Sequence, residues 1–519
     1  MYALTMCHLL WRMRNVHPDS GVVAAGPDAA HTSRCTYGEL TERIEALAVG
    51  LREDLGLRPG GTATVLGWND QPHLELMFAV PLIGARVNSL NLRVGAATLA
   101  GLGASPIPDI VVVGSGVLEH PAVGADVAGF VAGLRDQGVP VIGAGDAAPD
   151  GAWSYESLVR RHLGRRLPDE PGDENATAFI FHTSGTTGSP KSYEVTHRAA
   201  LLHSLSQATV DASGIRRSDR VLPLAPFFHV NGWGLPLTCA LTGASLVLAG
   251  ADLGPARVAA LMDEERVTVA AAVPTVWHDV CAAVDAGTAP RPRALREVLT
   301  GGSPVSESLC RSIRTVLGAG VATAWGMTET MACSAYEREL PHRRAGRPIP
   351  LIELAIDDGA AQDEAADPGT APPGRLLVRG PFVVGAPGES WCATGDIATL
   401  DPGGNLTLRD REKDLIKSGG EWIVSAELEQ HLCRHPAVAS AVVVPVPHPR
   451  WGERPVAYIV PADAVVPGEA ELSDYLARTF PCWWVPDRIV VVERLPTTAV
   501  GKIDKKALRK IANPEKEPV

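Results

Sequence analysis

Short apolar, β-branched runs alternate with stretches of helical periodicity over most of the chain. The runs that predict buried strands lie at 62–68, 109–115, 176–181, 244–250 and 267–273. Between such runs, apolar residues recur every three or four positions, as in 37–55 and 255–267, which predicts amphipathic helices. Strands separated by helices predict βα units and largely parallel sheets with helices on both faces.

The pattern changes near residues 410–414. Residues 403–410 (GGNLTLRD) predict a hairpin that closes a β-rich region. The chain after this point predicts a second hairpin, a helix over 425–434 and a strand over 438–446, so the last ~100 residues suit a small α+β domain. Residues 356–374 are acidic and rich in Pro and Gly, which predicts an exposed loop.

Length, charge and cysteine usage narrow the class of protein. A chain of 519 residues is too long for one hydrophobic core, and its net charge of −12 argues against a broad nucleic-acid-binding face. No apolar run is long enough to predict a membrane span, and the N-terminal residues lack the order of a signal peptide. The nine cysteines are scattered without a CxxC pair, which favours reduced thiols in the cytoplasm over disulfides or a zinc site. We therefore expect a cytoplasmic enzyme.

Residues 181–198 (FHTSGTTGSPKSYEVTHR) form a Gly- and hydroxyl-rich segment after a predicted strand. Such a segment lets backbone N–H groups converge on an anion. A P-loop needs Gly before Lys191 and a helix after it, whereas Pro190 precedes Lys191 and residues 193–195 favour a strand. Thr196 is then the expected N-cap of the next helix. We interpret the segment as a phosphate-binding loop of another class, with a plain turn as the alternative.

Several motifs together resemble the adenylate-forming superfamily, which contains acyl-CoA synthetases, firefly-type luciferases and adenylation domains of nonribosomal peptide synthetases. The loop at 181–198 is similar to its signature loop. The other matching segments follow in the family's order and are PFFHVNGWGLPL (226–237), LTGGSP (299–304), AWGMTET (324–330), ATGDIATLDPGGNLTLRDREKDLIKSGGEWI (393–423) and PTTAVGKIDKKAL (496–508). Residues 66–85 also look like a medium-chain acyl-CoA ligase.

The resemblance implies an α/β fold of the adenylate-forming type. It has a large N-terminal AMP-binding region of two α/β subdomains and a β-rich subdomain (1–410), a hinge (411–413) and a small mobile α+β C-terminal lid (414–519). The implied reaction uses ATP and Mg²⁺ to convert an acid to an acyl-adenylate with release of pyrophosphate. A thiol, most often that of CoA, then displaces AMP after the lid has rotated.

The resemblance also implies which residues bind ATP and metal. The expected ATP-binding residues are Thr183, Ser184, Gly185, Thr186, Thr187, Gly188, Lys191, Gly302, Ser303, Pro304, Trp325, Gly326, Met327, Thr328, Asp396, Arg411 and Lys502. Among them Asp396 is expected at the ribose, Trp325 at the adenine and Thr328 at the α-phosphate. Glu329 is the expected Mg²⁺ ligand, and Lys502 is the expected catalytic lysine that bridges carboxylate and α-phosphate. The neighbouring Lys505, Lys506 and Lys510 are expected to be solvated.

Two further groups of residues concern the acid and the thiol. His229, counted with Lys191, Thr328, Glu329 and Lys502 among the catalytic candidates, is expected beside the carboxylate of the acid. The expected acid pocket consists of His229, Val230, Asn231, Gly232, Trp233, Gly234, Gly301 and Gly302. The hinge and the mobile hairpin for the thiol step are expected to contain Lys413, Lys417, Gly419 and Gly420.

Two departures from the family pattern leave the acid open. Relatives have Gly and an apolar pair after the loop lysine, whereas this chain has Ser192, Tyr193 and Glu194. Residues 91–111 are also shorter and richer in Gly and Ala than in fatty-acyl ligases. These departures leave three alternatives for the substrate: a fatty acid, an aryl acid or, as in diazotase-type relatives, nitrite, in a member from specialised metabolism. The acceptor is CoA, a carrier-protein thiol or an amine, and a catalytically silent nucleotide-binding scaffold is the alternative of another class.

Overall fold

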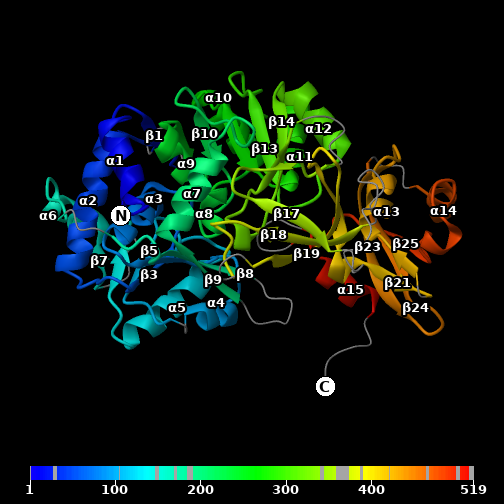
Figure 1. The fold of residues 1–519 in the computed structure, drawn as a ribbon, viewed down its shortest axis with the longest axis horizontal. Helices are drawn as coiled ribbons and strands as arrows, with labels where there is room; N and C mark the ends of the chain where they lie inside the picture. Colours follow the sequence, from blue (N-terminus) through cyan, green and yellow to red (C-terminus); the bar gives the residue numbers. More distant parts are fainter. Residues whose placement is uncertain are drawn as a thin grey trace.

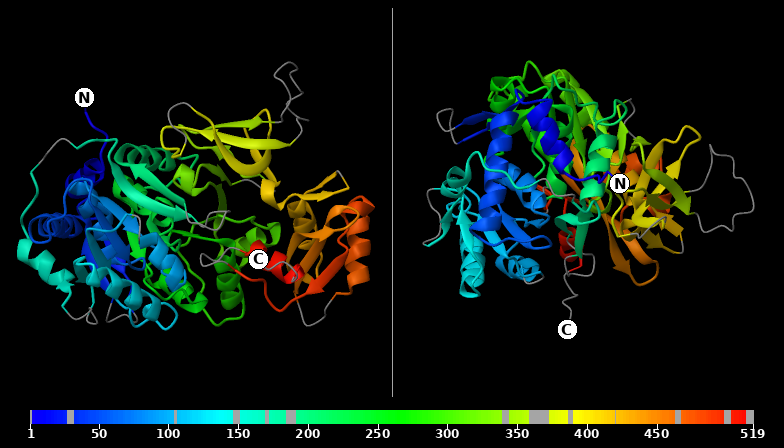
Figure 2. Two further views of the ribbon diagram at one scale, coloured as in Figure 1. Left: turned by 90° about the horizontal axis from the view of Figure 1, so that it is seen from below. Right: turned by 60° about the vertical axis from the view of Figure 1, so that its left-hand side comes forward.

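The described part of the chain forms four sheets with their helices. The structure, a computed structural model, describes residues 2–26, 32–103, 106–145, 151–168, 172–183, 191–338, 344–357, 373–385, 390–419, 421–462, 467–497 and 503–513. Figure 1 shows two large sheets at the left and centre, a smaller sheet beside them, and the C-terminal sheet at the right. Figure 2 shows the small four-stranded sheet (yellow) next to the C-terminal sheet (orange).

The first α/β sheet has seven strands in the order β7-β6-β5-β3-β4-β8-β9. Its strands are β3 (Thr62–Leu66), β4 (Arg86–Ser89), β5 (Ile110–Val113), β6 (Val141–Gly143), β7 (Trp153–Ser154), β8 (Thr177–Thr183) and β9 (Lys191–Thr196). Its pairs are parallel except β8–β9. Its helices are α2 (Tyr37–Glu53), α3 (Gln71–Leu82), α4 (Ala96–Gly103), α5 (Gly124–Asp136) and α6 (Tyr155–His162). In β5, Ile110 and Val112 face the core with α2, α3 and α6, while Val111 and Val113 face the core with α4 and α5.

The second α/β sheet has nine strands in the order β16-β15-β14-β13-β12-β10-β11-β1-β2. Its strands are β1 (Gly21–Ala24), β2 (Ser33–Thr36), β10 (Arg220–Pro223), β11 (Ser245–Leu248), β12 (Val269–Ala272), β13 (Glu297–Gly301), β14 (Gly320–Trp325), β15 (Ala335–Glu337) and β16 (Arg347–Pro348). Its associated helices are α1 (Cys7–Asn15), α7 (His197–Gln207), α8 (Val230–Trp233), α9 (Leu235–Thr242), α10 (Pro255–Glu264), α11 (Pro274–Asp285), α12 (Glu307–Ser312), the π-helix η2 (Ile313–Leu317) and the 3-10 turn η3 (Thr328–Thr330).

The remaining two sheets are antiparallel for the most part. The four-stranded sheet contains β17 (Glu353–Asp357), β18 (Gly374–Arg379), β19 (Cys392–Leu400) and β20 (Leu406–Arg411). The five-stranded C-terminal sheet contains β21 (Ile416–Ser418), β22 (Glu421–Ile423), β23 (Val438–His448), β24 (Gly452–Pro461) and β25 (Arg488–Val491). Around it lie η4 (Glu412–Asp414), α13 (Ser425–Leu432), α14 (Glu469–Ala477), η5 (Cys482–Trp484) and α15 (Lys505–Ala512).

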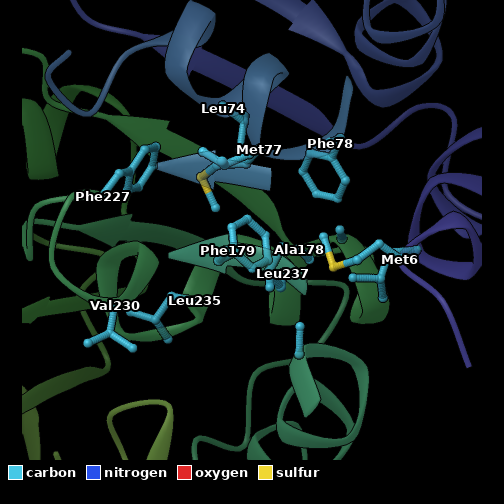
Figure 3. Close-up of a cluster of buried hydrophobic side chains, with 14 of the residues drawn as sticks. Met6, Leu74, Met77, Phe78, Ala178, Phe179, Phe227, Val230, Leu235 and Leu237 are labelled. Carbon is cyan, nitrogen blue, oxygen red and sulfur yellow. The ribbon is translucent and has the colours of Figure 1, made fainter. Parts of the chain in front are cut away.

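The large N-terminal part and the C-terminal part each have a buried hydrophobic cluster of their own. The largest contains residues of both α/β sheets and of the four-stranded sheet, and Figure 3 shows side chains of α3, β8 and α9 converging on Phe179. A second cluster, from Ile416 to Ile489, contains only residues after β20. The C-terminal sheet thus buries an apolar face against its own helices, in a core separate from that of the large part.

The predicted elements are confirmed where the structure describes them. Each of the five apolar runs contains a strand (β3, β5, β8, β11 and β12), and the two helical stretches contain α2 and α10. The predicted loop 356–374 lies mostly outside the described residues. None of the helices in the described ranges is both long and apolar enough to cross a membrane.

Candidate active site

The glycine-rich segment leaves the end of strand β8 and returns as strand β9. Thr183 pairs with Lys191 in this antiparallel ladder, so these two predicted phosphate-binding residues flank the segment. The predicted residues between them, Ser184, Gly185, Thr186, Thr187 and Gly188, lie outside the described residues. Lys191 begins a strand and not a helix, and the Thr196 hydroxyl caps α7 by accepting a 3.1 Å hydrogen bond from Ala199 N–H. The prediction against a P-loop is confirmed because the helix that a P-loop requires is replaced by β9.

Ser192, which departs from the glycine expected on the family pattern, uses its side chain to anchor the start of β9. The Ser192 hydroxyl lies 3.1 Å from Nδ1 of His182, and Nε2 of His182 lies 2.7 Å from the Asn88 amide oxygen on β4. Burial lowers the pKa of His182, so the imidazole is neutral near pH 7. This chain of contacts fixes β9 to the sheet directly beside Lys191.

Tyr193 connects β9 to the predicted metal ligand. Burial, followed by a hydrogen bond to Glu329 and the charge of Glu329, raises the pKa of Tyr193 to about 12. The Tyr193 phenol is therefore protonated near neutral pH and can donate to the Glu329 carboxylate. Its ring also packs beside Gly385: Cε1 of Tyr193 lies 3.7 Å from the position that a Cβ atom at Gly385 would occupy, which is ordinary van der Waals contact. The sequence signalled Tyr193 as a departure from the family but did not predict this contact.

The predicted adenine-binding segments follow two adjacent parallel strands, β13 and β14. Gly301 pairs with Ala324, and a Cβ at Gly301 would lie 2.3 Å from the Ala324 carbonyl oxygen. Gly302 has a φ of +77°, which favours glycine, and it turns Ser303 and Pro304 away from the sheet. The carboxyl ends of the two strands therefore place Gly302–Pro304 beside Trp325, at the edge where α/β sheets bind ligands.

Residues 326–330 make a tight turn at the end of β14. Gly326 has no room for a side chain, since a Cβ would lie 1.2 Å from the Ala332 carbonyl oxygen. Met327 precedes the 3-10 turn η3, in which Thr328 is buried and Glu329 is half-buried. The Glu329 carbonyl accepts a 2.7 Å hydrogen bond from Val384 N–H, which fixes the backbone from which the carboxylate extends.

Asp396 joins the predicted ribose and adenine residues into one site. It pairs with Arg411 in the β19–β20 ladder, and Nε of Arg411 lies 2.6 Å from Asp396 Oδ1. The Trp325 indole N–H donates a 2.9 Å hydrogen bond to Asp396 Oδ2. The Asp396 side chain is 5% exposed and that of Arg411 48%, so the carboxylate is shielded while the guanidinium faces solvent.

The predicted acid-pocket segment is a strained turn between β10 and α9 that contains the short α8. Val230 and Trp233 have φ values of +45° and +63°, and Gly232 and Gly234 also lie in the left-handed region. Such a conformation is unfavourable for the β-branched Val230 and is maintained only by its surroundings. Val230 is buried, and the Gln207 amide donates a 2.9 Å hydrogen bond to the Trp233 carbonyl. His229 is half-buried, and the side chain of Asn231 lies outside the described residues.

Residues of α7 form a part of this region that sequence reasoning missed. His203 is fully buried against Gly234, where a Cβ would lie 2.8 Å from the His203 ring, and it packs edge-on against Phe382 at 5.3 Å between ring centroids. Burial lowers the pKa of His203 to about 4, so its ring is neutral. Its position on α7 follows from the N-cap at Thr196, but its burial depends on residues distant in the sequence.

The predicted hinge starts at the end of β20 of the four-stranded sheet, and the predicted mobile hairpin, β21–β22, belongs to the C-terminal sheet. Lys413 is exposed in η4, and its carbonyl accepts a 3.1 Å hydrogen bond from Arg509. Lys417 is exposed on β21, with Nζ 5.5 Å from the centroid of the Trp422 ring. Gly419 has a φ of +63° at the tip of the β21–β22 hairpin, whereas Gly420 lies outside the described residues.

The predicted catalytic Lys502 also lies outside the described residues, but the chain on both sides of it is described. Thr497 and Ile503 form an antiparallel bridge, and Asp504 N–H donates a 2.8 Å hydrogen bond to the Pro496 carbonyl. The residues on either side of 498–502 are therefore adjacent.

Among the predicted site residues, the structure brings Thr183 next to Lys191, Trp325 and Arg411 to Asp396, and Tyr193 to Glu329.

Among the described residues, one carboxylate is suited to bind Mg²⁺ together with the nucleotide, and there is no preformed site of several protein ligands. Among them no group of three or more His, Cys, Asp or Glu side chains could hold a metal ion. Mg²⁺ in nucleotide sites is commonly held by one or two carboxylates and by phosphate oxygens. Burial and the charge of Glu329 raise the pKa of the nearby Cys392, so this thiol is neutral and a poor ligand. Glu329 therefore fits as a hard-oxygen ligand that needs the nucleotide to complete the metal site.

Comparisons with known proteins identify the family and the fold. Residues 11–386 match the AMP-binding enzyme family, and residues 427–502 match the AMP-binding enzyme C-terminal domain. A 3-methylmercaptopropionyl-CoA ligase of Ruegeria lacuscaerulensis is 34% identical over 98% of this chain and 97% of its own length. A long-chain-fatty-acid–CoA ligase of Thermus thermophilus is 36% identical over 92% of this chain and 90% of its own. An anthranilate CoA ligase, solved with anthranoyl-AMP, shares the fold with a TM-score of 0.85 at 21% identity, covering 99% of this chain and 98% of that one.

Proposed function

This chain belongs to the AMP-binding enzyme family, the adenylate-forming acyl-CoA ligases, and we propose that Trp325, Asp396 and Arg411 hold the nucleoside of its ATP. The observation that carries this assignment is the pair of contacts at Asp396, to the Trp325 indole at 2.9 Å and to Arg411 at 2.6 Å. Each carboxylate oxygen has two lone pairs, so Asp396 can keep both contacts and still accept from ribose hydroxyls. Gly302, Ser303 and Pro304 would form the opposite wall of the adenine slot.

The phosphates would lie between the β8–β9 loop and the turn η3. Thr183 and Lys191 flank the loop, and Thr328 and Glu329 occupy the turn, to which Tyr193 connects the loop. Glu329 would hold Mg²⁺, which when bound neutralises charge on the phosphate oxygens. Ser184, Gly185, Thr186, Thr187 and Gly188 are assigned to the β- and γ-phosphates from their sequence motif alone.

Adenylation joins an anionic acid to the α-phosphorus of ATP and releases pyrophosphate. Two anions must approach each other, so the chain has to supply positive charge and alignment more than a general base. Lys502 would supply that charge between the carboxylate and the α-phosphate, and Thr328 would donate to the α-phosphate. His229 would orient the carboxylate from the strained turn at 226–234.

The second half-reaction requires a different arrangement of the same site. Residues 411–413 would form the hinge between the N-terminal region (1–410) and the lid (414–519), which is supported by the separate buried cluster after β20. Rotation at Lys413 would withdraw Lys502 and bring the Lys417–Gly420 hairpin to the thiol channel. The thiol of CoA would then attack the acyl carbonyl and release AMP.

We assign the acid to the fatty or aryl class and the acceptor to CoA. Curated relatives act on 3-methylmercaptopropionate and long-chain fatty acids, and a structural neighbour binds anthranoyl-AMP, which supports both acid classes. Ser192, Tyr193 and Glu194 set this chain apart and fit a specialised biosynthetic member. The nine cysteines all lie in described ranges as free thiols, which supports a cytoplasmic site of action.

The test is pyrophosphate release from Mg²⁺-ATP across a panel of acids with and without CoA. The panel contains short to long fatty acids, benzoates, cinnamates, and nitrite with an aminoaryl acid. Release with a carboxylic acid, followed by a thioester mass only when CoA is present, is the expected result. Release only in the reaction that contains both nitrite and the aminoaryl acid, with a diazonium product, would replace the proposed substrate class. Tight ATP binding with no release for any acid would instead favour a nucleotide-binding scaffold.

A further inference from the structure

Lys505, expected from the sequence to be solvated, has its charged end in a cluster of polar groups. The Lys505 side chain is 20% exposed, and its Nζ lies 2.7 Å from Oε1 of Glu429, a side chain that is 13% exposed. The same ammonium donates a 2.9 Å hydrogen bond to the hydroxyl of Ser425. The prediction of a solvated Lys505 is therefore wrong, whereas Lys506 and Lys510 are exposed as expected.

The cluster reaches across the predicted hinge. The Ser425 hydroxyl donates a 2.9 Å hydrogen bond to Oδ2 of Asp410, and Ala426 N–H lies 3.3 Å from the same oxygen. Asp410 belongs to β20 of the four-stranded sheet, one residue before Arg411. Lys505 and Ser425 belong to the C-terminal part, so Ser425 connects the ammonium to β20, the last strand before the hinge.

The first turn of α15 also holds the chain on either side of Lys502. Asp504 caps α15 by accepting a 3.0 Å hydrogen bond from Ala507 N–H, and its own N–H donates to the Pro496 carbonyl at 2.8 Å. Thr497 and Ile503 form a bridge, so the two described residues that flank 498–502 are adjacent, and Ile503 lies two positions before Lys505. Fixing Lys505 therefore fixes the attachment of the segment that contains Lys502.

One turn later, Arg509 contacts the other side of the hinge. It donates a 3.1 Å hydrogen bond to the Lys413 carbonyl and forms an ion pair with Asp414. Arg509 thus contacts the chain just after Arg411–Glu412 directly, whereas Lys505 is connected to Asp410, just before it, through the Ser425 hydroxyl. A buried ammonium requires paired anions, and Glu429 with Asp410 supplies them here. This requirement makes the position of α15 relative to β20 specific.

We propose that Lys505 is a positioning residue for adenylation, which through Ser425 and Asp410 sets the orientation of α15, and with it the placement of Lys502, relative to β20. This inference rests on the proposed role of Lys502. Lys505 is not proposed to contact the reacting atoms. It acts by holding α15, and so the described residues that flank 498–502, in place relative to β20. The contacts at Asp410 belong to the present arrangement of lid and β20, and they need not persist after rotation for the thiol step.

The test separates the two half-reactions in Lys505→Met, which keeps most of the length of the side chain but removes its charge. Adenylation is measured as acid-dependent ATP–pyrophosphate exchange with octanoate or benzoate, whichever the acid panel selects. Thioester formation is measured from CoA and the corresponding synthetic acyl-adenylate. We expect exchange to fall by about 100-fold, the effect of a misplacement of about 1 Å, while thioester formation stays within a few fold. Lys506→Met, the exposed neighbour, is the matched control and should leave both rates unchanged.

Two further variants make the result decisive. Ser425→Ala removes only the bridging hydroxyl and leaves the Lys505–Glu429 pair. It therefore tests the positioning role even if Lys505→Met does not fold. Its exchange rate should fall more than its rate of thioester formation. Equal losses in both half-reactions, or a lowered melting temperature with unchanged rates, would overturn the positioning role. Lys502→Ala is measured in parallel. If Lys502→Ala leaves exchange intact, the proposed function of Lys502 is refuted. If exchange is lost in Lys502→Ala but not in Lys505→Met or Ser425→Ala, only the role of Lys505 is refuted.

Discussion

The indole N–H of Trp325 donates a 2.9 Å hydrogen bond to the Asp396 carboxylate, across 71 positions of the chain and between two different sheets. Trp325 ends β14 of the nine-stranded sheet, and Asp396 lies within β19 of the four-stranded sheet. One contact therefore fixes the wall proposed for adenine to the acceptor proposed for ribose. A phenol or a phenyl ring at position 325 could stack on a base, but only the indole provides this N–H in this geometry.

Replacing Trp325 with Phe tests the contribution of that hydrogen bond. The ring is kept, but the Asp396 carboxylate loses a donor, and a hydrogen bond to a charged group contributes about 1.5–3 kcal/mol. We expect the KM for ATP to rise by roughly tenfold or more, since about 1.4 kcal/mol corresponds to a factor of ten. Steady-state pyrophosphate release at varied ATP measures this. Trp153→Phe, at a partly exposed tryptophan outside the site, is the control, and equal KM values for both variants would contradict the prediction.

Replacing Tyr193 with Phe tests its contact with Glu329. The phenol is protonated near neutral pH because its pKa is raised to about 12, so in the native enzyme it can donate to the carboxylate. Partners that orient a metal-binding carboxylate typically affect metal affinity by about 10–100-fold when removed. We expect the free Mg²⁺ concentration for half-maximal pyrophosphate release to rise by about tenfold. An unchanged or lowered Mg²⁺ requirement would show that Tyr193 does not orient Glu329.

The close approach of β13 and β14 at Gly301 predicts opposite effects for two glycine-to-alanine substitutions. A Cβ at Gly301 would lie 2.3 Å from the Ala324 carbonyl oxygen, so Gly301→Ala must push the strands apart, at a cost of about 1–3 kcal/mol. Gly129 of α5 has nothing within 4 Å of a Cβ position, so Gly129→Ala should stabilise the helix by about 0.5–1 kcal/mol. Thermal unfolding should show a lower Tm for Gly301→Ala and a slightly higher one for Gly129→Ala. A Tm for Gly301→Ala at or above the native value would contradict the proposed packing.

Local patterns were sufficient to predict individual elements and the residues of several motifs. The apolar run at 62–68 contains β3 (Thr62–Leu66), and it lacks alternation because this strand is buried on both faces. The strand after Lys191 and the cap at Thr196 followed from proline, β-branched and hydroxyl residues within a few positions. These features depend on neighbours in the sequence, and the structure confirms them.

Long-range contacts could not be predicted in the same way. The hydrogen bond from Lys505 to Ser425 joins residues 80 positions apart, and nothing near Lys505 distinguishes it from the exposed Lys506. The strand order of the nine-stranded sheet places β1, from the start of the chain, next to β11, with β2 at the edge beyond it. The left-handed φ of Val230 is also invisible in a motif, because only surrounding packing can maintain it.

His203 gives the stability of the protein a pH dependence that can be isolated by substitution. Burial lowers its pKa from 6.5 in the unfolded chain to about 4 in the folded protein. Between these values the unfolded state binds a proton that the folded state does not, so the stability contributed by neutral His203 is complete above pH 6.5 and is lost as the pH falls towards 4. In His203→Leu this loss is absent. Urea unfolding at several pH values should therefore show the native free energy of unfolding falling relative to His203→Leu by up to about 1.4 kcal/mol per pH unit below pH 6.5. Because His73 and His197 also have pKa values lowered to about 4 and remain in both proteins, their effects cancel in the difference. Parallel curves for the two proteins would mean that the His203 ring is not buried as a neutral group.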